Sequence, residues 1–341
     1  MKSSAKLGSP GTPVASEGSG MSTEAILGGP AGASKTALWR RLLPFVLALA
    51  LLGVVLLRLD LPSLGVALAS APLFKLLAFT AVWNVGLLVA DAWATAWVYR
   101  RSVCEVRFSE LFVLRGASYL PSLLNHHVGQ AWLTYFLARV HNAELWRMAG
   151  ATFIVYATTF GCLLGIGLLS LPFNPDSLSW LGPIAALVLI AGGFYLAFIG
   201  WKPSKLRSWP LLAPAFQLGV RGHLVALAVR LPHLAVLFVG VWLPLHWFGV
   251  AIPLADALVV VPPVVLVSAL PVTPQGVGTR DALAVFLFQK FAAPGIDAEA
   301  QIAAATLSWA VALTAVQLLS SPFLMRRAYR LLGSKYSGGE A

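Results

Sequence analysis

The sequence predicts an all-α, polytopic membrane protein, and three observations favour this fold class. Hydrophobic residues make up 58% of the 341 residues and charged residues only 11%, whereas soluble domains carry about 25% charged residues. The mean hydropathy is +0.81. Uncharged stretches recur along the chain at lengths near the roughly 20 residues that a helix needs to cross a bilayer. Lipid is therefore expected to surround much of the folded protein.

Charged residues mark the limits of about six predicted transmembrane spans. Asp91 interrupts the second span, and the fifth is expected to begin as early as Arg221. The spans lie within residues 41–58, 75–100, 147–176, 176–202, 230–256 and 299–326.

Two further regions, residues 108–140 and 254–291, are too irregular for simple spans. Each has two short apolar arms around a polar centre that contains Gly and Pro. Arms of this length favour re-entrant helical hairpins, because irregular backbone is tolerated in a membrane only where protein covers it or water lines it. In the alternative, some arms cross the membrane and the total rises to about eight helices or more.

Composition divides the chain into three parts. Residues 1–34 are rich in Gly, Ser, Ala and Pro and are predicted to form a disordered tail without a cleavable signal peptide. Residues 35–335 form the predicted membrane domain, and residues 336–341 form a short C-terminal tail. Cys104 and Cys162 lie far apart in sequence and predict neither a disulfide nor a zinc site.

The cations predict the orientation. The net charge is +11, and Lys and Arg gather in short loops and tails rather than in a stripe interleaved with exposed aromatics, so nucleic acid is not expected as a partner. The loops at one end of the spans are basic, which predicts that both termini are cytoplasmic. The cations at this end include Lys35, Arg40, Arg41, Arg100, Arg101, Arg107, Lys202, Lys205, Arg207, Arg326, Arg327, Arg330 and Lys335.

The two irregular regions resemble each other. Ser-x-Leu-Pro, Val-Gly and Phe-Leu recur in the same order, starting at Ser118 and at Ser268, and each region follows two predicted spans. Given the predicted orientation, the hairpins enter from opposite sides, which predicts an inverted repeat with half-repeats at about 40–172 and 178–325. Such repeats place a site near the membrane midplane that each side reaches in turn. We therefore expect the two hairpins to face a shared cavity.

The second region carries the strongest local motif. Gly276 and Gly278 permit backbone conformations that side chains forbid. Thr279 is placed to cap the following helix, with Asp281 in its first turn. Arg280 then lies at a helix start within the membrane, where a fixed cation suits a lipid phosphate. In the alternative, Arg280 pairs with Asp281 and only holds the hairpin together.

The first region has a polar centre that contains Asn125, His126, His127 and Gln130. Neighbouring helical residues point about 100° apart, so the two histidines are poorly placed to bind one metal ion. The centre is predicted to line a headgroup site. The alternative is a polar hairpin tip at the membrane interface.

Charged residues within the spans are costly to keep without a partner or a function. Asp91 is expected to carry a proton or to pair with a cation. Arg230 and His233 are expected at the cytoplasmic edge rather than in a cavity. The candidate partners of Asp91 are Arg115, Arg139 and Arg280.

These motifs resemble the lysylphosphatidylglycerol synthase transmembrane-region family, also called flippase-like or UPF0104. The signature is Gly276-Val277-Gly278-Thr279-Arg280-Asp281-Ala282, with Asp281 where the family usually has Glu. An earlier segment is similar at Pro121, Gly129-Gln130 and Arg139, with Gln130 in place of the usual acid. The resemblance covers roughly residues 40–330.

The resemblance implies a flippase-type membrane domain in the cytoplasmic membrane of a bacterium. In the best-known members, this domain moves an aminoacylated phospholipid that a separate soluble domain makes, and no such domain is expected here. The predicted function is translocation of a phospholipid or lipid-linked headgroup between leaflets. The expected partners are an anionic or aminoacylated phospholipid or a polyprenyl phosphate, together with a homo-oligomer or a synthase.

Two other functions stay open, an intramembrane lipid-modifying enzyme and a non-transporting partner of a lipid synthase. An enzyme needs a convergent set of reacting groups, and the candidates Asp91, His126, His127 and Asp281 are scattered. We therefore predict no catalytic residue, no metal and no cofactor. The candidate substrate-binding residues are Arg280, Asp281, Gly276, Gly278, Thr279, Asn125, His126, Gln130, Arg139 and Asp91.

Overall fold

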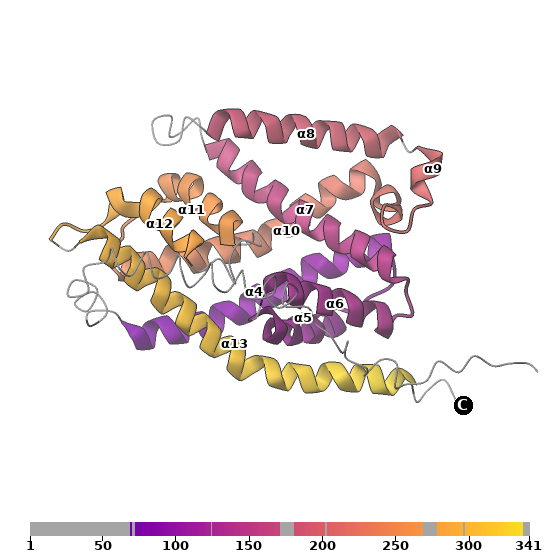
Figure 1. The fold of residues 1–341 in the computed structure, drawn as a ribbon, viewed down its shortest axis with the longest axis horizontal. Coiled ribbons are helices and arrows are strands. Elements are labelled where there is room, and N and C mark those ends of the chain that lie inside the picture. Colours follow the sequence, from indigo (N-terminus) through magenta and orange to yellow (C-terminus); the bar gives the residue numbers. More distant parts are fainter. Residues whose placement is uncertain are drawn as a thin grey trace, which may run out of the picture. The chain divides into compact units, whose positions relative to one another are not determined.

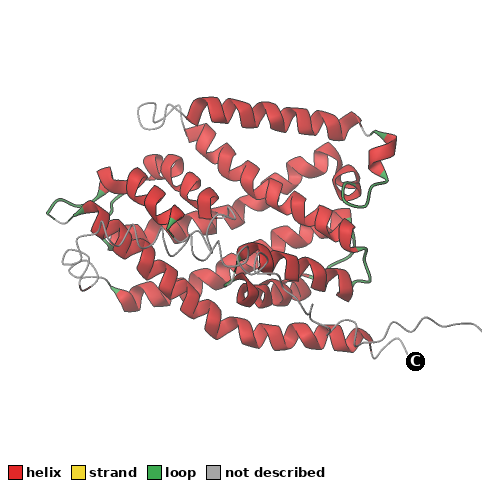
Figure 2. Ribbon diagram, in the orientation of Figure 1, coloured by secondary structure: helices red, strands yellow, loops and turns green. Residues whose placement is uncertain are grey.

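The computed structural model describes residue 69 and residues 72–123, 125–170, 181–201, 203–268, 278–295 and 297–336. These residues form helices joined by loops, with one isolated bridge between Val250 and Ala292 (Figure 2). The predicted all-α class is therefore confirmed for the described part of the chain. The first predicted span, within residues 41–58, lies outside the described residues.

Five of the described helices are long and apolar enough to cross a membrane. They correspond to the second to sixth predicted spans, so this part of the prediction is confirmed. The helices are α4 (Leu73–Ser102), α7 (Leu145–Ser170), α8 (Leu181–Trp201), α10 (Ala213–Trp247) and α13 (Ala298–Tyr336) (Figure 1).

Helix α10 begins at Ala213, earlier than the predicted start near Arg221, and it contains a kink near its start. The backbone at Gly219 is non-helical, with φ at 63° and ψ at 175°. A positive φ of this kind favours glycine, because a Cβ atom would be strained there. His223 and Tyr195 brace the kink, since His223 Nδ1 lies 2.7 Å from the Gly219 carbonyl and its Nε2 lies 2.8 Å from the Tyr195 hydroxyl.

Each irregular region contains a pair of short helices. In the first, α5 (Phe108–Ser122) and α6 (His126–Val140) have 15 residues each and pack against each other. At 1.5 Å per residue each is about 23 Å long, less than the roughly 30 Å of a bilayer core. In the second, α11 (Leu254–Ser268) packs against α12 (Thr279–Phe288), which a 3₁₀ turn, η3 (Gln289–Phe291), follows. Their re-entrant course and the inverted repeat stay predictions.

The long helices pack in pairs, with α4 along α10 and α13 along α5. The contact between α4 and α10 is close because the Trp83 ring lies directly on Gly240. Trp83 is 5% exposed, and its Nε1 donates to the Val236 carbonyl at 2.6 Å. This bond and the close approach hold the two helices in one register.

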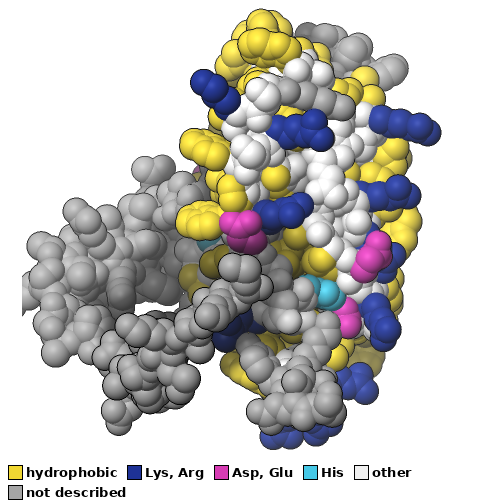
Figure 3. Space-filling model, turned by 90° about the vertical axis from the view of Figure 1, so that its right-hand side faces the viewer, with side chains coloured by type: hydrophobic (Ala, Val, Ile, Leu, Met, Phe, Trp, Pro, Cys, Tyr) yellow, Lys and Arg dark blue, Asp and Glu magenta, His cyan; other side chains and the backbone are white. Residues whose placement is uncertain are grey.

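One end of the helices is basic. Figure 3 shows this face, over which Lys and Arg side chains are spread. Arg100 and Arg101 lie in the last turn of α4, and the short helix α9 (Ser204–Arg207) contributes Lys205 and Arg207. The charge pattern that predicts a cytoplasmic orientation for the termini is thus present on the folded chain. The orientation itself stays a prediction.

Gly129 is where α6 crosses α5 most closely. A Cβ atom at Gly129 would overlap Ser122 Oγ and lie 2.7 Å from the Ser118 carbonyl oxygen. We expect Gly129→Ala to lower the free energy of unfolding by about 1–3 kcal/mol, because the helices must separate. Thermal unfolding in detergent measures this effect. Gly167→Ala is the matched control, since its Cβ would meet nothing within 4 Å; equal melting temperatures for the two variants would contradict the prediction.

Candidate functional site

Asp91 lies at the centre of a buried cluster of polar side chains. Its carboxylate accepts hydrogen bonds from Arg115 Nε at 2.5 Å and from Arg230 Nη1 at 2.6 Å, one on each oxygen. Thr95 Oγ1 donates to Oδ1 at 3.2 Å, and His233 Nδ1 lies 4.0 Å from the same oxygen. Both carboxylate oxygens of Asp91 are therefore occupied by groups of the protein.

Three helices bring this cluster together. Asp91 and Thr95 lie one turn apart on α4 and so share a face. Arg115 comes from α5, whereas Arg230 and His233 come from α10. Arg230 is the middle residue of α10 and is 1% exposed. The cluster therefore lies deep in the membrane part rather than at its edge.

Arg115 extends the cluster to α6. Its Nη1 lies 3.5 Å from Ser118 Oγ. With the Gln130 amide turned so that its oxygen faces the guanidinium, Gln130 accepts from both Nη atoms, at 3.0 Å from Nη2. The Arg115 side chain is 11% exposed, against 1% for Arg230. Arg115 is thus the more accessible of the two cations.

Three buried polar atoms around the cluster have no hydrogen-bond partner. They are Nε2 of His127, the hydroxyl of Tyr156 and Nδ1 of His233. The Tyr156 ring lies against the rings of His126 and His127, with centroids 6.1 and 6.2 Å away. Buried polar atoms in proteins normally have partners, so the hydrogen-bonding capacity of these three atoms is unused within the described residues.

The charges of the cluster do not balance. Two guanidinium groups share one carboxylate, and guanidinium stays protonated in proteins. With neutral histidines, the cluster formed by the described residues carries one surplus positive charge. A buried cation without a counter-charge is costly. The arrangement therefore suits an anion, and phosphate in particular, because its oxygens match the planar donor fork of arginine.

A second polar feature lies at the start of α12. Arg280 Nη2 donates to Asp281 Oδ1 at 2.7 Å, and the Gly278 amide donates to Asp281 Oδ2 at 3.0 Å. Gly278 has a φ of 86°, a conformation that favours glycine. The Arg280 guanidinium carbon lies 5.5 Å from the centre of the Trp309 ring. Arg280 therefore has the partner that the alternative interpretation of this motif expects, and its charge is balanced.

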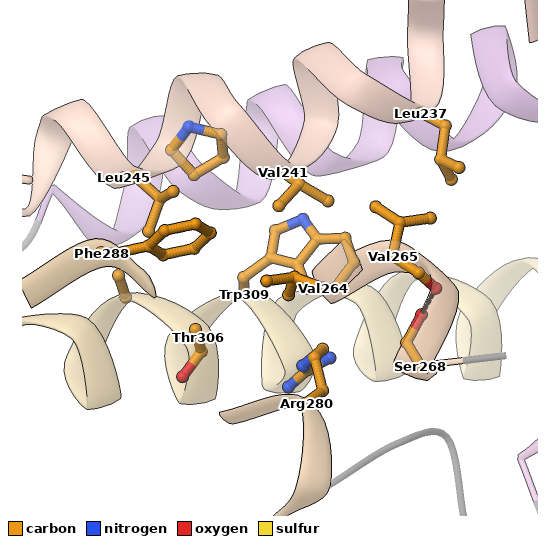
Figure 4. A pocket seen from close by; sticks show the side chains of 12 residues that line it. Leu237, Val241, Leu245, Val264, Val265, Ser268, Arg280, Phe288, Thr306 and Trp309 are labelled. Atoms are coloured by element: carbon orange, nitrogen blue, oxygen red, sulfur yellow. Dashed lines mark hydrogen bonds between the residues drawn. The ribbon is translucent and has the colours of Figure 1, made fainter. Parts of the chain in front are cut away.

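An apolar pocket adjoins Arg280 (Figure 4). Side chains from α10, α11, α12 and α13 line a cavity of about 60 Å³. Figure 4 shows the Trp309 ring between Val241 of α10 and Arg280 of α12. Among the described residues, those that line the pocket include none from α5 or α6. This pocket is therefore not the cavity that the sequence predicts between Arg280 and the first hairpin.

The structure separates the candidate residues into groups. Asp91 and Gln130 belong to the Arg115 cluster, and His126 lies beside it against Tyr156. Asn125 caps α6, because its side chain accepts from the His127 amide at 2.8 Å. Arg139 lies in the last turn of α6, far along the helix from Gln130. Thr279 is the first residue of α12, and the N-cap is Gly278, so the prediction that Thr279 caps this helix is wrong. Gly276 lies outside the described residues. Their roles in binding stay predictions.

Arg230 and His233 correct the sequence interpretation, which placed them at the cytoplasmic edge. They are 1% and 8% exposed, and Arg230 is bonded to Asp91. The edge interpretation relied on nearby basic residues such as Arg221, but Arg221 is exposed and points elsewhere on the same helix. The missed signal was the apolar run at residues 224–229, which shows that the span continues upstream of Arg230 and does not end there. Tyr156 carried no distinguishing sequence signal.

A comparison with known families decides the membership of the chain. The family model described as "Lysylphosphatidylglycerol synthase TM region" matches residues 41–321. The chain belongs to this family. The match includes both the Asp91 cluster and the Arg280 pocket, so both lie in the part of the chain that defines the lysylphosphatidylglycerol synthase membrane region. No curated protein and no solved structure matches the chain.

Membership agrees with the resemblance that the Gly278–Asp281 segment indicated. The chain is an integral membrane protein with several candidate spans, from a family implicated in the handling of lipids and aminoacyl-lipids.

Proposed function

We propose that the protein moves a phospholipid or lipid-linked headgroup between membrane leaflets and acts as a transporter rather than an enzyme. One observation carries this proposal: the Asp91 cluster holds two arginines against one carboxylate at the middle of α10. A charged headgroup is the part of a lipid that cannot cross the hydrocarbon core unaided, and a buried polar site at that depth lowers its barrier.

The short helices support the proposal. Helices α5 and α6 are too short to cross a bilayer core comfortably, and α5 carries Arg115 while α6 carries Gln130. In the proposed architecture, this pair and the α11–α12 pair are re-entrant hairpins of an inverted repeat. Alternate access from the two leaflets to the cluster then follows from movement of the hairpins against the long helices.

Arg115→Gln tests the proposal. The variant leaves the Asp91–Arg230 pair in place and removes the more accessible cation. A charge-assisted hydrogen bond contributes about 1.5–3 kcal/mol, so leaflet exchange is expected to slow by about tenfold or more. The measurement is the rate at which headgroup-labelled phospholipids in proteoliposomes become accessible to an external quencher.

Arg221→Gln is the matched control, because Arg221 lies on α10 but is exposed. Its exchange rate is expected to equal that of the unaltered protein. The proposal fails if the unaltered protein accelerates exchange of no lipid class, polyprenyl phosphates included. Lipid mass spectrometry of a deletion strain gives the complementary result, because an enzyme would leave a modified lipid missing whereas a transporter leaves the lipid pool chemically complete.

A further inference from the structure

We infer that the lipid recognised at the Asp91 cluster has a net negative headgroup that bears phosphate, and that a lipid with an aminoacylated, net positive headgroup is disfavoured there. This inference rests on the proposed function for transport, but it concerns binding and is testable separately. It is carried by the distribution of charge around Arg115.

The anion preference follows from what each charged group already contacts. Arg230 is held on two sides, by Asp91 through Nη1 at 2.6 Å and by Thr95 through Nη2 at 3.2 Å. Arg115 donates a hydrogen bond from its Nε to Asp91 at 2.5 Å, and its Nη atoms face the neutral side chains of Ser118 and Gln130. Asp91 balances only one of the two guanidinium charges, and the Nη atoms of Arg115 face neutral dipoles. An anion beside them is attracted strongly because the site is buried, with the Arg115 side chain 11% exposed.

The rejection of a cationic headgroup follows from the acids. An ammonium group needs a carboxylate or several carbonyl oxygens to replace its hydration. Asp91 has both oxygens occupied by arginine. The other described acids lie in loops or near helix starts, away from the cluster: Glu105, Glu110, Glu144, Asp256, Asp281, Asp297 and Glu299. Within the described residues, nothing offers an ammonium group a second carboxylate at the cluster.

The polar atoms beside Arg115 are suited to phosphate oxygens. The Tyr156 hydroxyl is buried without a partner, and so is Nε2 of His127. Hydroxyl groups and neutral imidazole both supply a hydrogen-bond donor. Tyr156 of α7 and His127 of α6 thus add donors to the Nη atoms of Arg115 on α5, and the inferred headgroup would use them together. A phosphodiester, with one negative charge, matches the single surplus positive charge.

Gln130→Glu is the decisive variant. It preserves side-chain shape and adds a second carboxylate beside the Arg115 guanidinium, so that the cluster becomes neutral. Arg115→Gln also makes the cluster neutral, by removing a cation instead of adding an anion. If one of the two variants fails to fold, the other still tests the inference. Gln217→Glu is the matched control, since Gln217 lies on α10 but contacts Arg147 rather than the cluster.

The binding experiment uses the full chain in detergent, with phosphatidylglycerol, phosphatidylcholine and lysyl-phosphatidylglycerol as probes, and reads apparent affinity from thermal stabilisation. Phosphatidylglycerol is expected to bind about tenfold or more tightly than lysyl-phosphatidylglycerol, because like charges repel strongly at buried sites. Gln130→Glu and Arg115→Gln are each expected to reduce this ratio by about tenfold, whereas Gln217→Glu leaves it unchanged. Equal or tighter binding of lysyl-phosphatidylglycerol by the unaltered protein overturns the inference.

The transport experiment separates this inference from the proposed function. The same three labelled lipids are followed in proteoliposomes. Faster movement of phosphatidylglycerol than of lysyl-phosphatidylglycerol supports both statements. Equal movement of the two lipids, or faster movement of the cationic one, overturns the charge preference and leaves transport standing. If no lipid moves while phosphatidylglycerol still binds preferentially, transport fails and the charge preference stands.

Discussion

Asp91→Asn is expected to destabilise the protein by about 3–5 kcal/mol, the range typical of breaking a buried ion pair. The variant leaves Arg115 and Arg230 close together without the carboxylate that both contact at 2.5 and 2.6 Å. Asparagine retains the shape of the side chain, so the loss reports charge rather than packing. The measurement is the midpoint of thermal unfolding in detergent, together with the yield of folded protein.

Asp256→Asn is the control for Asp91→Asn, because it removes a carboxylate from a more exposed ion pair. Asp256 lies 3.9 Å from Lys290, whose side chain is 52% exposed, and exposed pairs of this kind contribute at most about 1 kcal/mol. Adding Arg115→Gln to Asp91→Asn is expected to recover part of the lost stability, because it removes one of the two uncompensated cations. Similar melting temperatures for Asp91→Asn and Asp256→Asn would show that the buried pairs are not needed for folding.

Gly240→Ala is expected to have the second large effect, about 2–4 kcal/mol of destabilisation from overpacking and a broken hydrogen bond. A Cβ atom at Gly240 would overlap atoms of the Trp83 ring. The ring cannot turn aside at low cost, because its Nε1 donates to the Val236 carbonyl at 2.6 Å and its surface is 5% exposed. Thermal unfolding measures the loss, and tryptophan fluorescence reports displacement of the ring.

Gly193→Ala is the control for Gly240→Ala, since a Cβ atom at Gly193 of α8 meets nothing within 4 Å. It is expected to be neutral or slightly stabilising, because alanine favours the helix over the unfolded chain. If the two variants unfold at the same temperature, the α4–α10 contact is more compliant than its geometry indicates.

The long helices were predictable from the sequence because charged residues are excluded from the hydrocarbon core. The charged residues near positions 75, 100, 147 and 202 bracket α4, α7 and α8 closely. The start of α10 was harder to place, since Arg221 lies inside the helix and the kink at Gly219 comes before it. Proline does not end α11, because Pro262 and Pro263 lie inside this helix.

The candidate site was only partly predictable, because its key contacts join residues far apart in sequence. The sequence predicted that Asp91 carries a proton or pairs with a cation, with Arg115 among three candidate partners. The structure pairs Asp91 with Arg115 and also with Arg230. The bond between Arg230 and Asp91 links two helices across 139 positions. No local pattern encodes such a contact, since it depends on how α4 packs on α10. The Arg280–Asp281 pair, by contrast, joins residues adjacent in sequence, and the motif indicated it as the alternative interpretation.

The contact of the Trp83 ring with Gly240 also has a consequence for the Asp91 cluster, because it joins the two helices that carry Asp91 and Arg230. Sliding α4 past α10 would require the ring to leave Gly240 and Val236, so we expect the two helices to move together as one body. Asp91 and Arg230 both belong to that body, whereas Arg115 belongs to α5. In the proposed transport cycle, we expect the Asp91–Arg230 separation to stay constant while the Asp91–Arg115 separation changes. A pair of distance probes on α4 and α5, with a second pair on α4 and α10 as reference, would follow that motion directly.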